Sequence, residues 1–183
     1  HNIFESISVL TDTNNNIYIK DKHSIKNLYD FVFENMKKKN FLDFLQYSNI
    51  IEENICDTEL VIMLTIGDEE IGEYILNKLI SLHSDKLIAV SITHNLNYEK
   101  IRIKLKKFKN YILVISPEYG YDITPFLFLY KIVDNRINFN WVMKLHTKSN
   151  KEWLDKMLFS MIDVDIMDNI KSLNSNEVGI API

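Results

Sequence analysis

Long apolar runs recur along the chain from residue 59 onward, separated by segments of mixed polarity. A continuous apolar run of this kind is typical of a strand that is buried on both faces of a sheet. The runs therefore predict strands at 59–66, 86–93, 111–116 and 139–147, and the start of a fifth strand at 178–183.

Between these runs, apolar residues recur every three or four positions. This spacing places apolar side chains on one side of an α-helix and polar side chains on the other. In the basic segment 97–110, for example, Ile101, Leu105 and Phe108 share the inward side. The spacing predicts helices at 69–84, 97–110, 123–136 and 152–173.

The alternation of strands and helices predicts an α/β fold. Repeated βαβ units make the strands parallel and place helices on both faces, with right-handed crossovers. We therefore expect a Rossmann-like, mostly parallel sheet over 59–183. Ligands of such sheets bind outside the carboxyl ends of the strands. The loops at 67–70, 94–97 and 117–122 and the end of the fourth strand should converge on that rim.

The first 58 residues follow a different pattern. The segment 11–24 is polar and rich in turn-forming residues, with a short strand expected at 17–20. The segment 24–47 shows helical spacing of its apolar residues. We interpret 1–58 as a helical N-terminal lead-in or linker, and 59–183 as the main domain.

Charge and cysteine content exclude several classes of protein. The net charge of −4 argues against a nucleic-acid binder, because binding to the phosphate backbone needs a basic excess. A single cysteine, Cys56, cannot form an intramolecular disulfide and fits a reducing compartment. No apolar run reaches the ~20 residues that cross a membrane. We expect a cytoplasmic protein with no transmembrane segment and no nucleic-acid partner.

The segment WVMKLHTKSN, at the end of the fourth strand, carries unusual chemistry. Strand side chains alternate between faces, so Lys144, His146 and Lys148 share one face. Three potential cations in a row repel one another unless an anion lies opposite. Either this face is solvated near a loop, or it binds an anionic ligand at the rim of the sheet.

The segment GYDITPFL at 120–127 is followed by KLHTK at 144–148 and then by a helix with an early tryptophan, Trp153. In this order, the two segments resemble the rhamnan synthesis protein F family. The closing VGIAPI also resembles the next strand of that family. The resemblance covers roughly 60–183 and implies a GT-A-like glycosyltransferase. Such an enzyme transfers a sugar, for example a deoxyhexose such as rhamnose, from a nucleotide-diphosphate donor to a glycan or lipid-linked glycan acceptor.

The chain departs from the GT-A pattern at one place. In that pattern the fourth strand ends in Asp-x-Asp, which holds a divalent metal against the diphosphate, whereas this chain has the segment 144–148 there. The departure puts dependence on a divalent metal in doubt, and we assign no metal ligand. Cationic side chains are able to neutralise a leaving diphosphate directly. The chain also stops within the expected fifth strand, so we expect a GT-A-like domain truncated at its C-terminus.

Five residues are candidates for binding the nucleotide sugar. We expect Lys144 and Lys148 to contact the diphosphate, and Gly120 to allow close approach of the ligand. Thr65 and Thr93 end the first two strands, where this fold contacts the base or ribose. The plain alternative is a set of solvated polar residues at strand ends.

Two residues are candidates for catalysis. Asp122 lies at the rim, where it is able to bind sugar hydroxyls or to accept a proton from the acceptor. The alternative is that Asp122 caps the helix that follows, because aspartate is a favoured N-cap. His146 is a candidate base or diphosphate contact, and the alternative is a structural histidine.

Other functions remain open from the sequence. The protein could be a non-catalytic module that binds a nucleotide or a glycan, such as an inactive or truncated glycosyltransferase fragment. A receiver-like or flavodoxin-like module fits less well, because the chain lacks the acidic pocket and phosphate loops of such modules. No glycine-rich phosphate loop is present, which disfavours kinases and dinucleotide enzymes.

Overall fold

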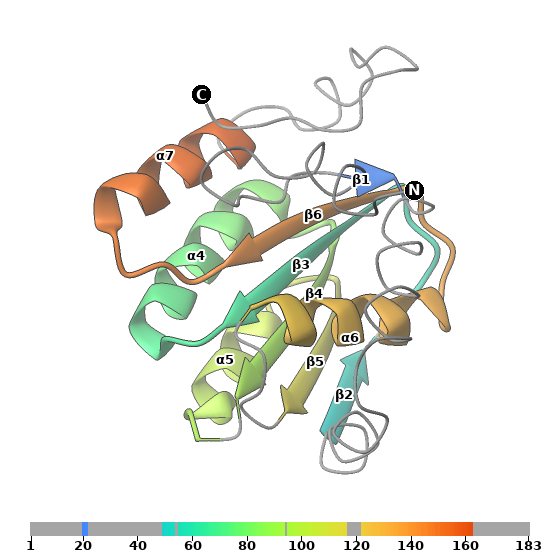
Figure 1. Ribbon diagram of the computed structural model, residues 1–183. Coiled ribbons are helices and arrows are strands. Elements are labelled where there is room, and N and C mark those ends of the chain that lie inside the picture. The colour runs from blue at the N-terminus through green and yellow to red at the C-terminus, as the bar shows by residue number, and fades with distance from the viewer. Residues whose placement is uncertain (1–19, 22–48, 54, 94, 117–121, 163–183) are drawn as a thin grey trace, which may run out of the picture.

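The computed structural model describes residues 20–21, 49–53, 55–93, 95–116 and 122–162. These residues form one sheet with helices on both faces, which confirms the α/β prediction (Figure 1). Its strands are β1 (Lys20–Asp21), β2 (Asn49–Glu53), β3 (Leu60–Ile66), β4 (Leu87–Thr93), β5 (Asn110–Ser116) and β6 (Trp141–His146). Its helices are α4 (Glu69–His83), α5 (Tyr98–Leu105), α6 (Ile123–Asp134) and α7 (Lys151–Met161).

The sheet has the strand order β1-β6-β3-β4-β5-β2. The inner pairings β6–β3, β3–β4 and β4–β5 are parallel, and the two outer pairings are antiparallel. The sheet is therefore mixed, and its order is compatible with a Rossmann-like fold. From β3 the chain proceeds to β4 and β5 on one side, and then crosses to place β6 on the other side of β3. The strand order thus reverses between β3 and β6, which is the switch point where such sheets hold their ligands.

Both edge strands come from the segment expected to precede the domain. β2 pairs with β5 from Asn49↔Ile115 to Glu53↔Tyr111, and the two-residue β1 pairs with β6. The sheet therefore begins before the boundary expected at residue 59. The hydrophobic pattern of β2 is weak, because its sequence NIIEE has only two apolar residues. β2 lies at an edge of the sheet, where a strand does not need apolar residues on both faces. The helix expected at 24–47 and the strand expected at 178–183 lie outside the described residues.

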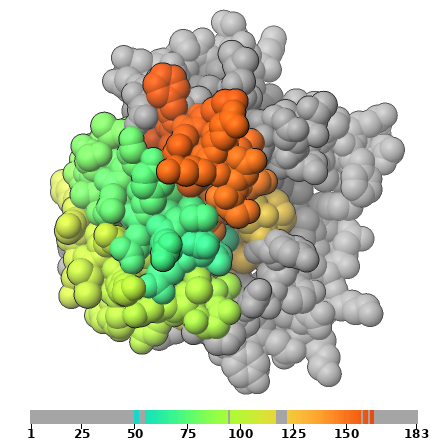
Figure 2. Space-filling model, turned by 90° about the vertical axis from the view of Figure 1, so that its left-hand side faces the viewer, coloured from blue at the N-terminus to red at the C-terminus, as the bar shows by residue number. Residues whose placement is uncertain are grey.

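Alternate residues of each inner strand pack into two separate cores. Ile62 and Leu64 of β3 face α4, α5 and α7, whereas Val61 and Met63 face α6. Figure 2 shows the first side of the molecule, on which the side chains of α4, α5 and α7 adjoin one another. The side chains link these helices, because the Tyr74 hydroxyl donates to Asp155 of α7 across 3.1 Å. No helix of the described residues has the length and apolar character needed to cross a membrane.

The start of α4 is determined by two local features. Asp68 is the N-cap, and its carboxylate accepts a hydrogen bond from the backbone N–H of Ile71 at 3.0 Å. One turn on, Gly72 allows the helix to approach β3 closely, since a Cβ there would lie 2.7 Å from Cγ2 of Ile66. These contacts hold the helix against the strand directly behind the rim of the sheet.

Candidate functional site

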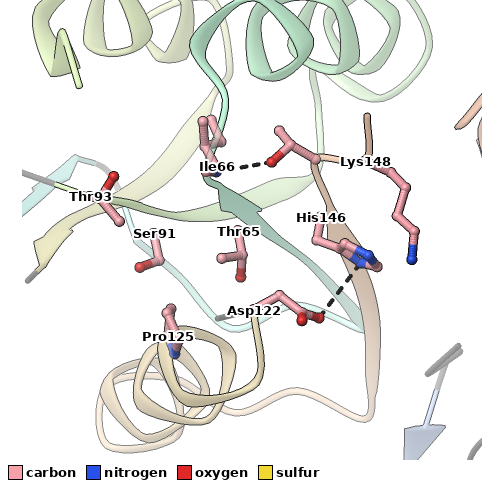
Figure 3. A pocket seen from close by; sticks show the side chains of 10 residues that line it. Thr65, Ile66, Ser91, Thr93, Asp122, Pro125, His146 and Lys148 are labelled. Atoms are coloured by element: carbon pink, nitrogen blue, oxygen red, sulfur yellow. Dashed lines mark hydrogen bonds and ion pairs between the residues drawn. The ribbon is translucent and has the colours of Figure 1, made fainter. Parts of the chain in front are cut away.

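A cavity of about 360 Å³ opens at the carboxyl ends of β3, β4 and β6, beside the start of α6 (Figure 3). It spans the switch point between β3 and β6, as expected for the rim. Polar side chains from each of these strands reach it. The residues that line it are Thr65, Ile66, Gly67, Ser91, Thr93, Asp122, Pro125, His146, Thr147 and Lys148.

Hydroxyl groups form the part of the cavity nearest the sheet. On the α6 face, the first residues of β3 and β4 are apolar. Toward their carboxyl ends the two strands carry the hydroxyl residues Thr65, Ser91 and Thr93 on this face. The pairing of the strands places Thr65 between Ser91 and His146. The sequence pattern led us to Thr65 and Thr93 and not to Ser91. The signal for Ser91 was present, because it lies two positions before Thr93 and so shares its face.

The end of β6 is bonded to the end of β3 through Thr147. The backbone N–H of Thr147 donates to the carbonyl oxygen of Thr65 at 3.1 Å, and the N–H of Gly67 donates to the Thr147 hydroxyl at 2.9 Å. These bonds hold the two strand ends together at the switch point. Neither Gly67 nor Thr147 was a candidate from the sequence, because the pairing of β3 with β6 is a tertiary feature.

Lys144 has an anionic partner within the chain. Its side chain is only 2% exposed, and its ammonium donates to Oδ2 of Asp122 across 2.5 Å. Lys144 does not line the cavity, where the sequence analysis placed it, and its charge is neutralised by Asp122. Asp122, at the start of α6, is therefore the anion that lies opposite the basic residues of β6.

Asp122 occupies the N-cap position of α6, but its side chain makes no capping hydrogen bond. The capping alternative for this carboxylate is therefore wrong, and the side chain turns to Lys144 instead. Burial acts to raise the pKa of Asp122, but the charge of Lys144 and its hydrogen bond outweigh burial, so the pKa lies below its ordinary value. An ionised carboxylate thus lines the cavity at neutral pH.

His146 shares the α6 face of β6 with Lys144, as its alternation with that residue predicts. Its Nδ1 lies 3.4 Å from Nζ of Lys144 and 3.8 Å from Oδ2 of Asp122. Burial, and then the charge of Lys144, lower the pKa of His146 to about 4, against the opposing effect of Asp122. The imidazole is therefore neutral at pH 7.

Lys148 lines the cavity beyond the end of β6, at the rim where the sequence placed it. Its Nζ lies 4.7 Å from the centre of the Trp153 ring, within the range of a cation–π contact. The Trp153 ring is half-buried and is 5.8 Å from the ring of His146. Among the described residues that line the cavity, Lys148 is the lysine, and it forms no ion pair with a carboxylate of another described residue.

The structure gives less information about Gly120 and about metal-binding groups. Gly120 lies outside the described residues, so its role stays a prediction. Within the part of the chain that the structure describes, no three His, Cys, Asp or Glu side chains gather into a metal-binding group.

The two segments that carry the family resemblance meet at the cavity. Asp122 and Pro125 come from 120–127, and His146 and Lys148 come from 144–148. The resemblance itself stays a prediction, because comparison of the chain with models of known families, with curated proteins and with solved structures finds no match.

Proposed function

We propose that this protein binds a nucleotide-diphosphate sugar in the cavity and transfers the sugar to a glycan or lipid-linked glycan acceptor. The observation that carries the proposal is the position of the cavity. It spans the switch point of a Rossmann-like sheet, with a carboxylate, a lysine and several hydroxyls on its wall. The GT-A type of the fold and a deoxyhexose as the donor sugar come from the family resemblance alone and belong to the proposal.

The side chains of the cavity suit the parts of such a donor. Lys148 is placed to neutralise the diphosphate, and its compact ammonium acts as a point charge. Asp122 accepts hydrogen bonds from sugar or ribose hydroxyls, and the hydroxyls of Thr65 and Thr93 bind the polar edge of the nucleoside. The buried Lys144 holds Asp122 in place and does not touch the ligand.

Transfer forms one carbon–oxygen bond, breaks another and moves one proton. A hydroxyl oxygen of the acceptor bonds to the anomeric carbon, the bond from that carbon to the diphosphate oxygen breaks, and the hydroxyl proton passes to a base. In this proposal Asp122 accepts the proton, and Lys148 stabilises the charge that develops on the leaving diphosphate.

The described residues do not form a set of ligands for a divalent metal. Asp122 is the one carboxylate among the described residues that line the cavity, and its Oδ2 already accepts from Lys144. A hard divalent ion needs several oxygen ligands. We therefore assign no step to a metal.

A specific observation favours the alternative of a non-catalytic binding module. The pKa of Asp122 is lowered by Lys144, and that of His146 is lowered to about 4. A base is most effective when its pKa lies near the working pH, so both groups are weak bases at pH 7. Both remain well suited to bind hydroxyls.

Thermal unfolding with nucleotides tests the proposal. We expect UDP, GDP or dTDP, or one of their sugar conjugates, to raise the melting temperature, because a ligand that binds only the folded state stabilises it. Lys148→Met should abolish this shift. Lys106→Met is the matched control, since Lys106 is exposed at the end of α5 and does not line the cavity.

A turnover assay separates the two functions. Release of nucleoside diphosphate that depends on an added glycan acceptor supports the transferase. A melting shift without such release of nucleoside diphosphate supports the binding module. If no nucleoside diphosphate or nucleotide sugar changes the melting temperature, the transferase and a nucleotide-binding module are both contradicted.

A further inference from the structure

Three polar groups lie within hydrogen-bonding or ion-pairing distance of one another at the cavity wall: Asp122 and His146 line the cavity, and Lys144 lies behind them. The ammonium of Lys144 lies 2.5 Å from Oδ2 of Asp122 and 3.4 Å from Nδ1 of His146. The carboxylate and the imidazole lie 3.8 Å apart, which is beyond hydrogen-bond range. Figure 3 shows the side chains of Asp122, at the start of α6, and of His146, on β6, pointing toward each other at the cavity.

The position of Lys144 decides which nitrogen of His146 carries the proton. An ammonium group has only donors, so Nδ1 of the facing imidazole is favoured as an acceptor. A proton on Nδ1 would point at the N–H groups of Lys144. The single proton of the neutral imidazole is therefore on Nε2. Among the described residues, none forms a hydrogen bond with Nε2, and the side chain is 15% exposed on the cavity wall.

We propose that Lys144 is a positioning residue that holds His146 as the neutral Nε2–H tautomer, so that His146 donates a hydrogen bond to an oxygen of the ligand and is not a base. The identity of the ligand rests on the proposed function, whereas the tautomer of His146 does not. Of the two functional roles expected for His146 from the sequence, the inference favours the ligand contact over the base. The cavity then offers a donor in His146 beside an acceptor in Asp122, which is the pairing that polyhydroxylated ligands such as sugars require.

The groups that face the imidazole come from three elements. Lys144 belongs to β6, Asp122 precedes α6, and Lys148 follows β6. Lys144 and Lys148 both disfavour a second proton on His146, whereas Asp122 favours it. Among the described residues, Lys144 is the one within hydrogen-bonding distance of Nδ1, so we assign the choice of tautomer to it.

Nitrogen NMR of the wild-type chain, labelled with ¹⁵N-histidine, tests the tautomer without any ligand. The chain has five histidines, and the signals lost in His146→Gln identify His146. We expect the Nε2–H form at pH 7. Detection of the Nδ1–H form or of imidazolium at this pH overturns the proposal.

Two lysine variants test the role of Lys144. In Lys144→Met, Asp122 becomes the nearest polar group to Nδ1, so we expect a proton on Nδ1 and a pKa that rises from about 4. Lys148→Met is the matched control, because it removes a nearby charge but no hydrogen bond to His146, and should keep the Nε2–H form. A folded Lys144→Met that keeps both the tautomer and the pKa overturns the proposal. If that variant does not fold, the wild-type spectrum still decides.

Two histidine variants test donation to the ligand. The amide nitrogen of glutamine is able to replace the Nε2–H donor, whereas leucine cannot. We expect His146→Gln to keep the nucleotide-sugar melting shift and turnover of the wild type within a few-fold, and His146→Leu to lose both. Equal loss in the two variants overturns the donor role. Absence of any shift in the wild type contradicts the proposed function instead, and leaves the tautomer result to decide the role of Lys144.

Discussion

The ammonium of Lys144 and the carboxylate of Asp122 form an ion pair of 2.5 Å between β6 and α6. The two residues are 22 positions apart in the chain, and their side chains are 2% and 34% exposed. Lys144 therefore depends on Asp122 for charge compensation, whereas Asp122 also reaches water. This asymmetry explains how a lysine is held on a sheet face whose other positions are mostly apolar.

Removing Asp122 should lower the free energy of unfolding more than removing Lys144. Asp122→Asn leaves a buried ammonium without its counter-charge, which costs about 3 kcal/mol of unfolding free energy or more. Lys144→Met leaves a carboxylate that water reaches, and we expect a loss of about 1 kcal/mol. Urea denaturation at pH 7 measures both. Equal losses in the two variants would contradict this account of the pair.

His146 should make the protein acid-sensitive between pH 6.5 and pH 4. The folded state takes up this proton only near pH 4, whereas the unfolded chain takes it up near the ordinary value of 6.5. Acid therefore favours the unfolded state in this window, and stability falls by about 3 kcal/mol as the pH drops through it. Asp122 contributes mainly below this window, because its pKa lies under its ordinary value of 3.8.

The urea midpoint measured from pH 7 to pH 4 checks the role of His146. His146→Gln has no titrating group at this position, so its midpoint should depend less on pH than that of the wild type. If the two profiles run parallel, His146 is not the source of the acid sensitivity.

Gly72 should not tolerate even a methyl group. A Cβ at this position would lie 2.7 Å from Cγ2 of Ile66, so Gly72→Ala forces α4 away from β3 and costs about 1–3 kcal/mol. Gly67→Ala is the matched control, because its Cβ would meet only the Thr147 hydroxyl oxygen at 3.7 Å. Thermal and urea unfolding of both variants check this. A larger loss at Gly67 than at Gly72 would refute the packing explanation.

Trp153 should strengthen binding of a diphosphate by holding Lys148 at the cavity. Loss of the cation–π contact in Trp153→Leu should weaken binding of the nucleotide about two- to fivefold, and Trp153→Phe should weaken it less. Phe159→Leu is a control on the same helix, because Phe159 is 67% exposed. Calorimetric titration measures the affinities. Wild-type affinity in Trp153→Leu would show that Lys148 needs no such support.

Local sequence pattern determined most of the inner fold. The apolar runs correspond to β3, β4, β5 and β6, and the helical spacing corresponds to α4, α5, α6 and the start of α7. These elements bury one or two faces, so the spacing of their apolar residues in the sequence shows the type of element. The same pattern also predicted the rim at which the cavity opens, because parallel strands bring their carboxyl ends to one edge of the sheet. From that rim, Thr65, Thr93, Asp122, His146 and Lys148 line the cavity.

Tertiary structure alone decided what each of these side chains faces. The period of a strand shows that Lys144 and His146 share a face, but not that Asp122 lies opposite them. That contact depends on how α6 packs across the sheet. Likewise, only the placement of β6 beside β3 brings Thr147 to Gly67. A period of two residues determines the face of a side chain, whereas its partner across space depends on the order in which the strands assemble.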